Sequence, residues 1–369
     1  MKTANILVIG GGIIGVSLAY GLAERGEQVT VLDYGKGVNN ASRGNFGLVW
    51  VQSKGLGMRR YAEWTMEAAQ LWQRFSEDLS EKTGIAIDYK KQGGFEVCLG
   101  ETEWSQRKVV LEQLRTESST GTYDCHMLDH QAVQDLIPEM RLGEAVYGAS
   151  FSPHDGHLNP LALLTALIAS LKKAGVTHYL DQQVESVSYR NDCFEIKTAG
   201  ENFSAKKVVL ACGLGIKVLA QQVGLEIPIR PQRGQILVTE RAKPLLPYPF
   251  VTLRQTQEGS FLIGSSHEDV GLDTGTTLSQ MRNLAGHAVQ IFPELARLQL
   301  LRCWGALRIL TPDTKPLYVE SDTCPGAFVV TSHSGITLAP LHANILSKWI
   351  LEGVTPEGFE QFHPKRFDA

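Results

Sequence analysis

The sequence has few cysteines, and none of them forms a Cys-x-x-Cys pair. Closely spaced thiols are typical of iron–sulfur sites, and a regular cysteine framework is typical of small disulfide-bonded folds. The wide separation of these thiols disfavours both, so we expect buried, reduced cysteines. The six are Cys98, Cys125, Cys193, Cys212, Cys303 and Cys324.

Long apolar runs and an excess of positive charge are also missing. No stretch of 18 or more apolar residues could span a bilayer, and the apolar segment near the start is broken by glycines and lacks the flanks of a secretory signal. The net charge is −4, and the 35 Lys and Arg residues are scattered. This disfavours nucleic-acid binding. We expect a cytoplasmic protein, with peripheral membrane association left open.

The segment NILVIGGGIIGVSLAYGLAERGEQVTVLD (5–33) predicts a strand, a helix and a second strand. Its apolar runs at 5–9 and 28–32 are typical of buried parallel strands, and Gly10, Gly12 and Gly15 between them stand in GxGxxG register. These glycines permit a tight turn, the approach of a pyrophosphate and close helix packing. Asp33, at the end of the second strand, is placed for a ribose. The pattern predicts an adenosine dinucleotide, either NAD or FAD.

The organisation after residue 33 favours FAD. An NAD domain would continue with further strand–helix–strand units. Here a loop rich in small residues spans 34–56, and an amphipathic helix follows at about 58–82. Later segments resume the nucleotide fold. We expect a helix with Asn159 as N-cap and Pro160 at its first position, and a final helix near 338–351. The remaining expected strands are 94–99, 184–189, 193–197, 207–212 and 327–331.

These elements predict an α/β protein with a Rossmann-like FAD-binding domain assembled from discontinuous segments. We assign residues 1–84, 151–222 and 320–369 to that domain. Residues 85–150 and 223–319 are assigned to an inserted α+β substrate-binding domain on a mainly antiparallel sheet.

Eight motifs in order resemble the FAD-dependent amine and amino-acid oxidoreductases that include D-amino-acid oxidase, glycine oxidase and sarcosine oxidase. They run nearly end to end: VIGGGIIG (8–15), ASRGNFG (41–47), DGHLNP (155–160), VVLACGLG (208–215), IRPQRGQILV (229–238), GSFLIGSS (259–266), WGALRILTPDTKPL (304–317) and HSGITLAP (333–340).

The resemblance implies a bound FAD, and the lack of a cysteine at the expected attachment positions implies that it is non-covalent. The implied cofactor contacts lie in the glycine turn, in the loop after it, and at the ends of later strands. They are Gly10, Gly12, Ile13, Ile14, Gly15, Asp33, Tyr34, Ser42, Arg43, Asn45, Gly47, Val184, Ala211, Cys212, Gly213, His333, Ser334, Gly335, Ile336, Thr337 and Leu338.

The resemblance also implies a substrate anchor at Arg308, which matches an arginine that binds the substrate carboxylate in glycine oxidase. The alternative is a structural arginine that bonds the adjacent TPD turn. Tyr248 and Arg254 are further candidates for the substrate face, although a packed aromatic and a surface charge explain them equally well. The histidines show no metal-ligand spacing, so we expect no metal.

In such proteins, hydride passes from the carbon bearing nitrogen to flavin N5, and the resulting imine hydrolyses without a strong acid–base side chain. The stretch SFLIG (260–264) lacks the lysine that promotes oxygen reaction in sarcosine oxidases. GNFGLVWVQSKG and HSGITLAP further resemble the FAD-carrying β-type subunits of opine oxidases, D-hydroxyproline dehydrogenases and hydrogen cyanide synthases.

The chain is thus expected to oxidise an amino acid or secondary amine carrying a carboxylate, within a complex whose companion subunits carry other redox centres. A stand-alone glycine, sarcosine or D-amino-acid oxidase using oxygen is the main alternative. An NAD-dependent dehydrogenase and a non-catalytic FAD-binding assembly subunit are alternatives of other classes.

Overall fold

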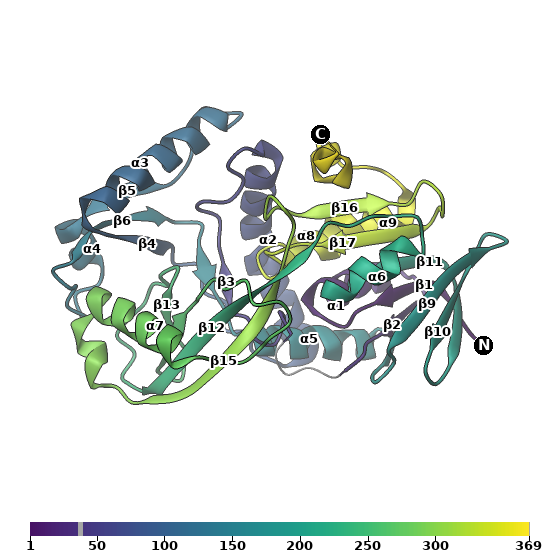
Figure 1. The fold of residues 1–369 in the computed structure, drawn as a ribbon, viewed down its shortest axis with the longest axis horizontal. Helices are drawn as coiled ribbons and strands as arrows, with labels where there is room; N and C mark the ends of the chain where they lie inside the picture. The colour runs from purple at the N-terminus through teal and green to yellow at the C-terminus, as the bar shows by residue number, and fades with distance from the viewer. Residues whose placement is uncertain (36–39, 369) are drawn as a thin grey trace.

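The computed structural model describes residues 1–35 and 40–368. Figure 1 shows two lobes side by side, one built on a mainly parallel sheet and the other on antiparallel strands. Two long strands, β12 (Arg230–Arg241) and β15 (Leu300–Leu310), pair with each other and extend from the antiparallel lobe towards the parallel one.

The parallel sheet draws its strands from distant parts of the sequence, as predicted for the nucleotide fold. Its order is β16-β17-β11-β1-β2-β8, and β10 and β9 continue from β11 as an antiparallel hairpin. The strands are β1 (Lys2–Ile9), β2 (Val29–Leu32), β8 (Thr177–Tyr179), β9 (Val184–Arg190), β10 (Cys193–Thr198), β11 (Asn202–Leu210), β16 (Leu317–Glu320) and β17 (Ala327–Thr331).

Both faces of this sheet are buried. In β1, Ile6 and Val8 belong to one apolar cluster, while Leu7 and Ile9 belong to another on the opposite face. This alternation explains the continuous apolar run at the start of the sequence. The helices of this lobe are α1 (Ile13–Ala23), α2 (Arg59–Thr83), α5 (Pro160–Lys173), α6 (Ile216–Gln221), α8 (Ala339–Leu341) and α9 (Ser347–Glu352), with short helical turns at Gly213–Gly215, Phe359–Phe362 and Pro364–Phe367.

The cap predicted for α5 is confirmed. The Asn159 side-chain oxygen accepts hydrogen bonds of 3.1 Å from the backbone N–H groups of both Leu161 and Ala162, and Pro160 occupies the first turn. These bonds satisfy donors that a helix leaves free at its start. The cap therefore fixes where DGHLNP turns from loop into helix.

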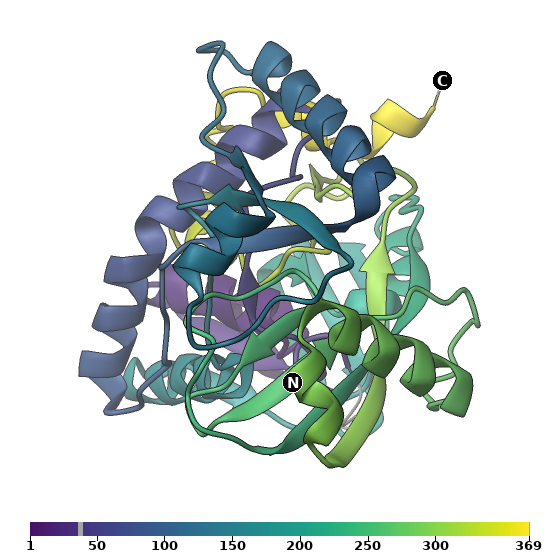
Figure 2. The ribbon, with the colours of Figure 1, turned by 90° about the vertical axis from the view of Figure 1, so that its left-hand side faces the viewer.

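The second lobe contains a sheet of order β13-β14-β12-β15 and a smaller one of order β4-β6-β5, both antiparallel. Phe95 and Phe250 form an isolated bridge between them and share one apolar cluster. Figure 2 shows α3 and α7 on the outer side of this lobe. The remaining elements are β4 (Gly94–Leu99), β5 (His126–Asp129), β6 (Val146–Ser152), β13 (Leu253–Gln255), β14 (Ser260–Gly264), α3 (Gly100–Glu117), α4 (His130–Leu136), α7 (Leu278–Ile291) and a turn at Pro293–Arg297.

A two-stranded ribbon of β3 (Leu48–Val49) and β7 (Gly156–His157) joins the loop after β2 to DGHLNP. The proposed domain boundaries stay predictions. β6 runs across the boundary at 150–151, and β16 runs across the boundary at 319–320.

The final helix expected near 338–351 is observed as a continuous helical stretch over 339–352, but it is not α-helical throughout. A π-helical turn at His342–Leu346 separates α8 from α9. At this turn α1 makes a close approach, because a Cβ on Gly21 would lie only 1.7 Å from the Ala343 carbonyl oxygen. The Arg25 guanidinium donates hydrogen bonds to the carbonyls of Ala343 and Asn344. A wider turn leaves such carbonyls available to side chains, and tertiary contacts of this kind are not visible in local sequence.

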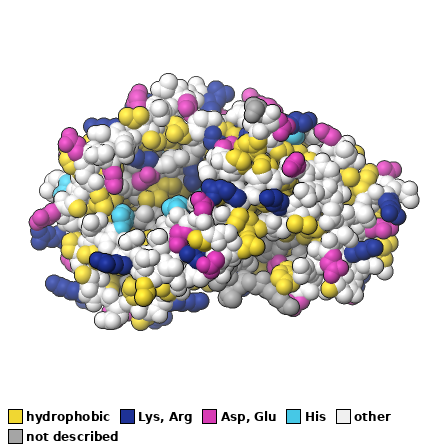
Figure 3. All heavy atoms as spheres, viewed as in Figure 1, with side chains coloured by type: hydrophobic (Ala, Val, Ile, Leu, Met, Phe, Trp, Pro, Cys, Tyr) yellow, Lys and Arg dark blue, Asp and Glu magenta, His cyan; other side chains and the backbone are white. Residues whose placement is uncertain are grey.

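On the face drawn in Figure 3, positive and negative side chains are interspersed and neither sign covers a large area. All six cysteines are unpaired. Cys98 and Cys125 are buried, whereas the other four are half-buried, in contrast to the expectation that all are buried. No helix within residues 1–35 and 40–368 combines the length and hydropathy needed to cross a bilayer.

Candidate active site

The glycine turn after β1 is too tight for any side chain. Gly10 has φ +116°, and a Cβ there would lie 2.5 Å from the Ala211 carbonyl oxygen. A Cβ on Gly15 would lie 1.9 Å from the Gly10 carbonyl oxygen. At Gly12 a Cβ would point at Ser42 Oγ, 2.9 Å away. The turn, the helix start and the following loop therefore meet without side chains between them, as a phosphate site requires.

Asp33 lies at the end of β2, next to this turn. Its backbone N–H donates to the Tyr179 carbonyl at 2.9 Å, while its carboxylate accepts no hydrogen bond from the described part of the chain. A Cβ on Gly11 would lie 2.5 Å from Asp33 Oδ2. Gln182 donates its backbone N–H to the Asp33 carbonyl, so Val184 follows close to the same strand end. A free carboxylate beside a glycine turn fits the ribose of an adenosine dinucleotide.

The loop at 40–47 is attached to the start of α1. The Ile13 N–H donates a hydrogen bond of 2.9 Å to Ser42 Oγ. Asn45 accepts from the Gly47 N–H at 2.7 Å, and the Gly47 carbonyl accepts from the Leu158 N–H at 2.9 Å. The loop is thus held between the glycine turn and DGHLNP. Its neighbours Tyr34, which is exposed, and Arg43 complete the predicted contacts of this region.

The segment at 333–338 is fixed by aromatic side chains. Tyr61 OH and Ser334 Oγ are 2.7 Å apart, and the Trp72 indole N–H donates to the Thr337 carbonyl at 2.9 Å. The Trp50 backbone N–H donates to Thr337 Oγ1 at 3.1 Å. Burial raises the pKa of Tyr61 to about 12, so its hydroxyl stays protonated. The segment is therefore rigidly placed. A Cβ on Gly335 would approach Ile14 Cγ1 to 3.2 Å, which brings this segment beside α1.

A cavity of about 430 Å³ lies between these two loops and the strands of the antiparallel lobe. Its lining joins elements that are far apart in the sequence, and it includes cations, histidines and apolar side chains. Among the lining residues are Asn45, Phe46, Trp50, Lys54, Ile236, His267, Arg308, His333, Ser334, Ile336 and Thr337. These surroundings fit the isoalloxazine of a flavin together with a small substrate.

Arg308 reaches this cavity from β15. Its guanidinium donates hydrogen bonds to the carbonyls of Ser266 (2.9 Å) and Arg233 (3.3 Å) and to Ser265 Oγ. These contacts orient the guanidinium, but no carboxylate in the described residues forms an ion pair with it. Burial lowers its pKa to about 10, so it remains charged at neutral pH.

The alternative for Arg308, a bond to the TPD turn, has no support in these contacts. Asp313 of that turn is instead paired with Arg366, whose Nε lies 2.9 Å from Asp313 Oδ2. The role of Arg308 as a substrate anchor stays a prediction, now with a defined geometry.

Two histidines share the cavity with Arg308. Burial lowers the pKa of His333 to about 3, and the charges of Lys54 and Arg308 act in the same direction. Burial also lowers the pKa of His267, whose Nδ1 lies 3.0 Å from Gln232 Oε1. Both imidazoles are therefore neutral at neutral pH. Among the described residues, no three His, Cys, Asp or Glu side chains are grouped to hold a metal ion.

Tyr248 and Arg254 are not brought to this cavity. Tyr248 packs edge-on against Phe95, with ring centroids 5.3 Å apart, and against Phe151. Arg254 is buried, and its Nε donates to the Phe46 carbonyl. Their predicted substrate contacts therefore find no support in the geometry, and both stay untested predictions.

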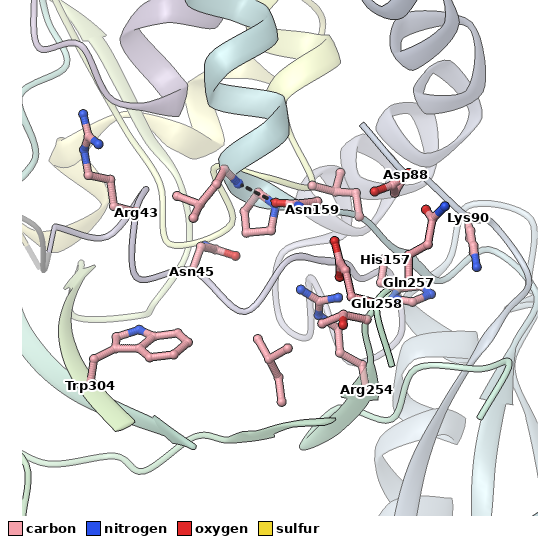
Figure 4. A pocket seen from close by; sticks show the side chains of 15 residues that line it. Arg43, Asn45, Asp88, Lys90, His157, Asn159, Arg254, Gln257, Glu258 and Trp304 are labelled. Atoms are coloured by element: carbon pink, nitrogen blue, oxygen red, sulfur yellow. Dashed lines mark hydrogen bonds between the residues drawn. The ribbon is translucent and has the colours of Figure 1, made fainter. Parts of the chain in front are cut away.

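Arg254 instead lines a separate cavity of about 170 Å³. Figure 4 shows Arg43 and Trp304 on one side of it and Arg254 and His157 on the other. Asn45 lines both cavities, so the loop at 43–47 lies between them.

The remaining predicted cofactor contacts directly follow β11, beside the glycine turn. They are Ala211, Cys212 and Gly213, and the Ala211 N–H donates a hydrogen bond of 2.8 Å to the Ile9 carbonyl.

Lys54 lines the cavity although the sequence did not predict it as a site residue. It stands in the loop that was predicted to border the flavin, and a charged residue in such a loop is the signal that could have identified it. A buried hydrogen-bond network around Gln52 and Asp155 was also not predicted, because its members come from four separate segments.

Comparisons with known proteins agree with this geometry. A family model described as FAD dependent oxidoreductase matches residues 5–349. One opine oxidase subunit, from Rhizobium meliloti, is 36% identical over 369 residues, which cover 100% of this chain and 99% of that protein, and its counterpart in Agrobacterium tumefaciens (strain Ach5) is also 36% identical. The crystal structure of glycine oxidase from Geobacillus kaustophilus has a TM-score of 0.90 at 23% identity, covering 98% of both chains. The chain therefore belongs to the DAO family of FAD-dependent oxidoreductases, and it is a flavoenzyme that oxidises amines or amino acids.

Proposed function

We propose that this chain oxidises the C–N bond of a secondary or primary amine carrying a carboxylate, with opines, hydroxyproline and proline as the leading substrates. The observation that carries the proposal is the Arg308 guanidinium. It lines the cavity beside the loop at 40–47 and the segment at 333–338, and it has no carboxylate partner in the described chain. The planar fork of a guanidinium can bond both oxygens of a carboxylate and so fix the orientation of a substrate.

The residues around the cavity favour a neutral amine. With a pKa of about 3, His333 is a poor proton acceptor at neutral pH. The described lining contains no Asp or Glu that could hold a substrate ammonium in an ion pair. We infer that the substrate amine enters as the free base, or loses its proton on entry, without a dedicated catalytic base.

The apolar walls complete the site. Phe46, Trp50 and Ile336 line the cavity and limit the access of water to the reacting carbon. The bound flavin supplies the acceptor for a hydride from the carbon that bears nitrogen. The chain's own residues supply the orientation, through Arg308, and the rigid placement of both loops, through Ser42, Tyr61 and the other anchors given above.

We further propose that the chain works as the FAD-carrying component of a heteromeric dehydrogenase. The similarity to the opine oxidase subunits of two bacteria, whose name denotes one part of a larger enzyme, supports this. The stretch Ser260–Gly264 contains no lysine, which favours transfer of electrons to a quinone or a companion protein rather than to oxygen.

Anaerobic titration of the purified, FAD-loaded chain tests the proposal. The ligands are opines, proline, hydroxyproline, sarcosine, glycine and D-amino acids. We expect one of these classes to bleach the flavin. Reoxidation by air should be slow compared with reoxidation by a quinone. Fast reoxidation by air would instead identify a stand-alone oxidase, and an FAD-loaded chain that none of these ligands bleaches would identify a non-catalytic assembly subunit.

A further inference from the structure

Lys54 is a second cation in the Arg308 cavity. Its side chain is half-buried and lines the cavity, and the ammonium forms no hydrogen bond or ion pair with the described residues. Burial lowers the pKa of Lys54, the charges of Glu96 and Asp155 oppose this shift, and the weaker effect of Arg308 adds to it. An unpaired charge in a partly buried site costs stability. A carboxylate on a bound ligand could supply the direct partner that the described residues do not.

A rigid network presents Lys54 to the cavity. The buried Asp155 carboxylate accepts the backbone N–H groups of Val51 and Gln52 and, at 2.6 Å, the Gln52 side-chain amide. The Gln52 side-chain oxygen accepts from Arg107 at 2.8 Å. Ser53, directly before Lys54, has φ +69°. The network therefore fixes the backbone from which the Lys54 side chain extends into the cavity.

Lys54 and Arg308 come from separate elements and have separate surroundings. Lys54 lies in the loop between β3 and α2. Arg308 lies on β15, and hydrogen bonds to Ser265 and Ser266 orient its guanidinium. A ligand with one carboxylate can neutralise one of these cations and leaves the other uncompensated. A ligand with two carboxylates can neutralise both.

We propose that Lys54 binds a second carboxylate of the substrate, so that the cavity selects amines carrying two carboxylates over amines carrying one. The inference rests on the proposed function, because it assigns the substrate class of the same site. It makes Lys54 a specificity-determining residue, distinct from Arg308, which anchors the carboxylate that both classes share.

The test compares two unreactive ligands that differ in one carboxylate, thiodiacetate and methylthioacetate. Their dissociation constants are measured by calorimetry on FAD-loaded wild-type protein, Lys54→Met and the control Lys217→Met, which changes an exposed lysine of α6. We expect the wild type to bind thiodiacetate at least about ten times more tightly than methylthioacetate. Lys54→Met should weaken thiodiacetate binding by about ten- to a hundredfold and leave methylthioacetate unchanged. Lys217→Met should change neither.

Two results would overturn the inference. Equally weakened binding of both ligands in Lys54→Met would show that Lys54 contacts the carboxylate that they share. Unchanged binding of both would show that Lys54 contacts neither ligand. Should Lys54→Met fail to fold, Lys54→Arg, which keeps the charge, must retain the wild-type preference for thiodiacetate, and loss of that preference in a folded, FAD-loaded variant counts against the proposal.

A parallel measurement separates this inference from the proposed function. Iminodiacetate and N-methylglycine, the reactive counterparts of the two ligands, are mixed anaerobically with the same preparations. A preference for thiodiacetate without any bleaching of the flavin would support the role of Lys54 and contradict amine oxidation. Bleaching by both N-methylglycine and iminodiacetate with equal affinity would support amine oxidation and contradict the role of Lys54.

Discussion

The backbone N–H of Ile13 donates a hydrogen bond of 2.9 Å to Ser42 Oγ, which attaches the loop at 40–47 to the first turn of α1. Ser42→Ala removes this bond and frees the loop where the pyrophosphate is expected. We expect FAD affinity to fall by about five- to tenfold, which corresponds to about 1 kcal/mol for one hydrogen bond. Fluorescence titration of the apoprotein with FAD measures it. Ser279→Ala, in an exposed position of α7, is the control, and equal FAD affinities for the two variants would contradict the expectation.

Gly15→Ala should destabilise the fold itself. Its Cβ would lie 1.9 Å from the Gly10 carbonyl oxygen, so α1 must move away from β1. Overpacking of this kind costs about 1–3 kcal/mol. Gly286→Ala, in the interior of α7 where a Cβ meets nothing within 4 Å, should stabilise the protein by about 0.5–1 kcal/mol. Urea unfolding of both variants measures the free energies. A neutral effect of Gly15→Ala would show that the turn has more room than the structure gives it.

Asp155 should make stability depend on pH. Burial raises its pKa to about 7, against hydrogen bonds from Val51 and Gln52 that lower it. Between its ordinary pKa of 3.8 and about 7, the folded protein binds one proton more than the unfolded chain. Its contribution to the free energy of unfolding therefore falls as pH rises through this window, by at most about 1.4 kcal/mol per pH unit, and levels off above it.

Asp155→Asn should remove this contribution. The difference in unfolding free energy between wild type and variant, measured in urea from about pH 5 to about pH 8, isolates it. The exposed residue Asp135, changed to Asn, serves as the control. A difference that stays constant with pH would show that Asp155 titrates outside this window.

Tyr61→Phe tests how the segment at 333–338 is held. The change leaves the buried Ser334 hydroxyl without its 2.7 Å partner, which costs about 1–2 kcal/mol. We also expect a shift in flavin fluorescence, because the segment borders the cavity. Tyr147→Phe, at an exposed tyrosine, should change neither quantity. Unchanged flavin fluorescence in Tyr61→Phe would show that this hydroxyl does not help to position the cofactor.

Much of the parallel lobe could be predicted from the sequence because its signals are local. The apolar run of β1, the glycines at 10, 12 and 15, and the Asn159 cap each determine their own neighbourhood. The strands 94–99 and 327–331 match the structure residue for residue. β11 begins at Asn202 rather than 207, because pairing with β10 as well as β1 extends it, and such pairing is not visible in one segment.

The candidate site was harder to predict because its parts meet only in three dimensions. Arg308 was found through a motif, but its partners Ser265 and Ser266 belong to another strand end. Tyr248 resembled a site residue in sequence and lies in an aromatic cluster instead. Lys54 lies within GNFGLVWVQSKG, but that motif assigns it no role, and only the cavity and the Asp155 network distinguish it from a surface lysine.

The most direct measurement is the rate of flavin reduction by a carboxylate-bearing amine, followed anaerobically in wild type, Arg308→Met and Arg302→Met. Arg302 is an exposed arginine on the same strand, β15. At low substrate concentration we predict that Arg308→Met reduces its flavin at least about a hundredfold more slowly, because a carboxylate loses its charged partner, and that Arg302→Met behaves as wild type. Reduction of Arg308→Met at the wild-type rate would contradict the assignment of this cavity as the site where the substrate's carboxylate is bound.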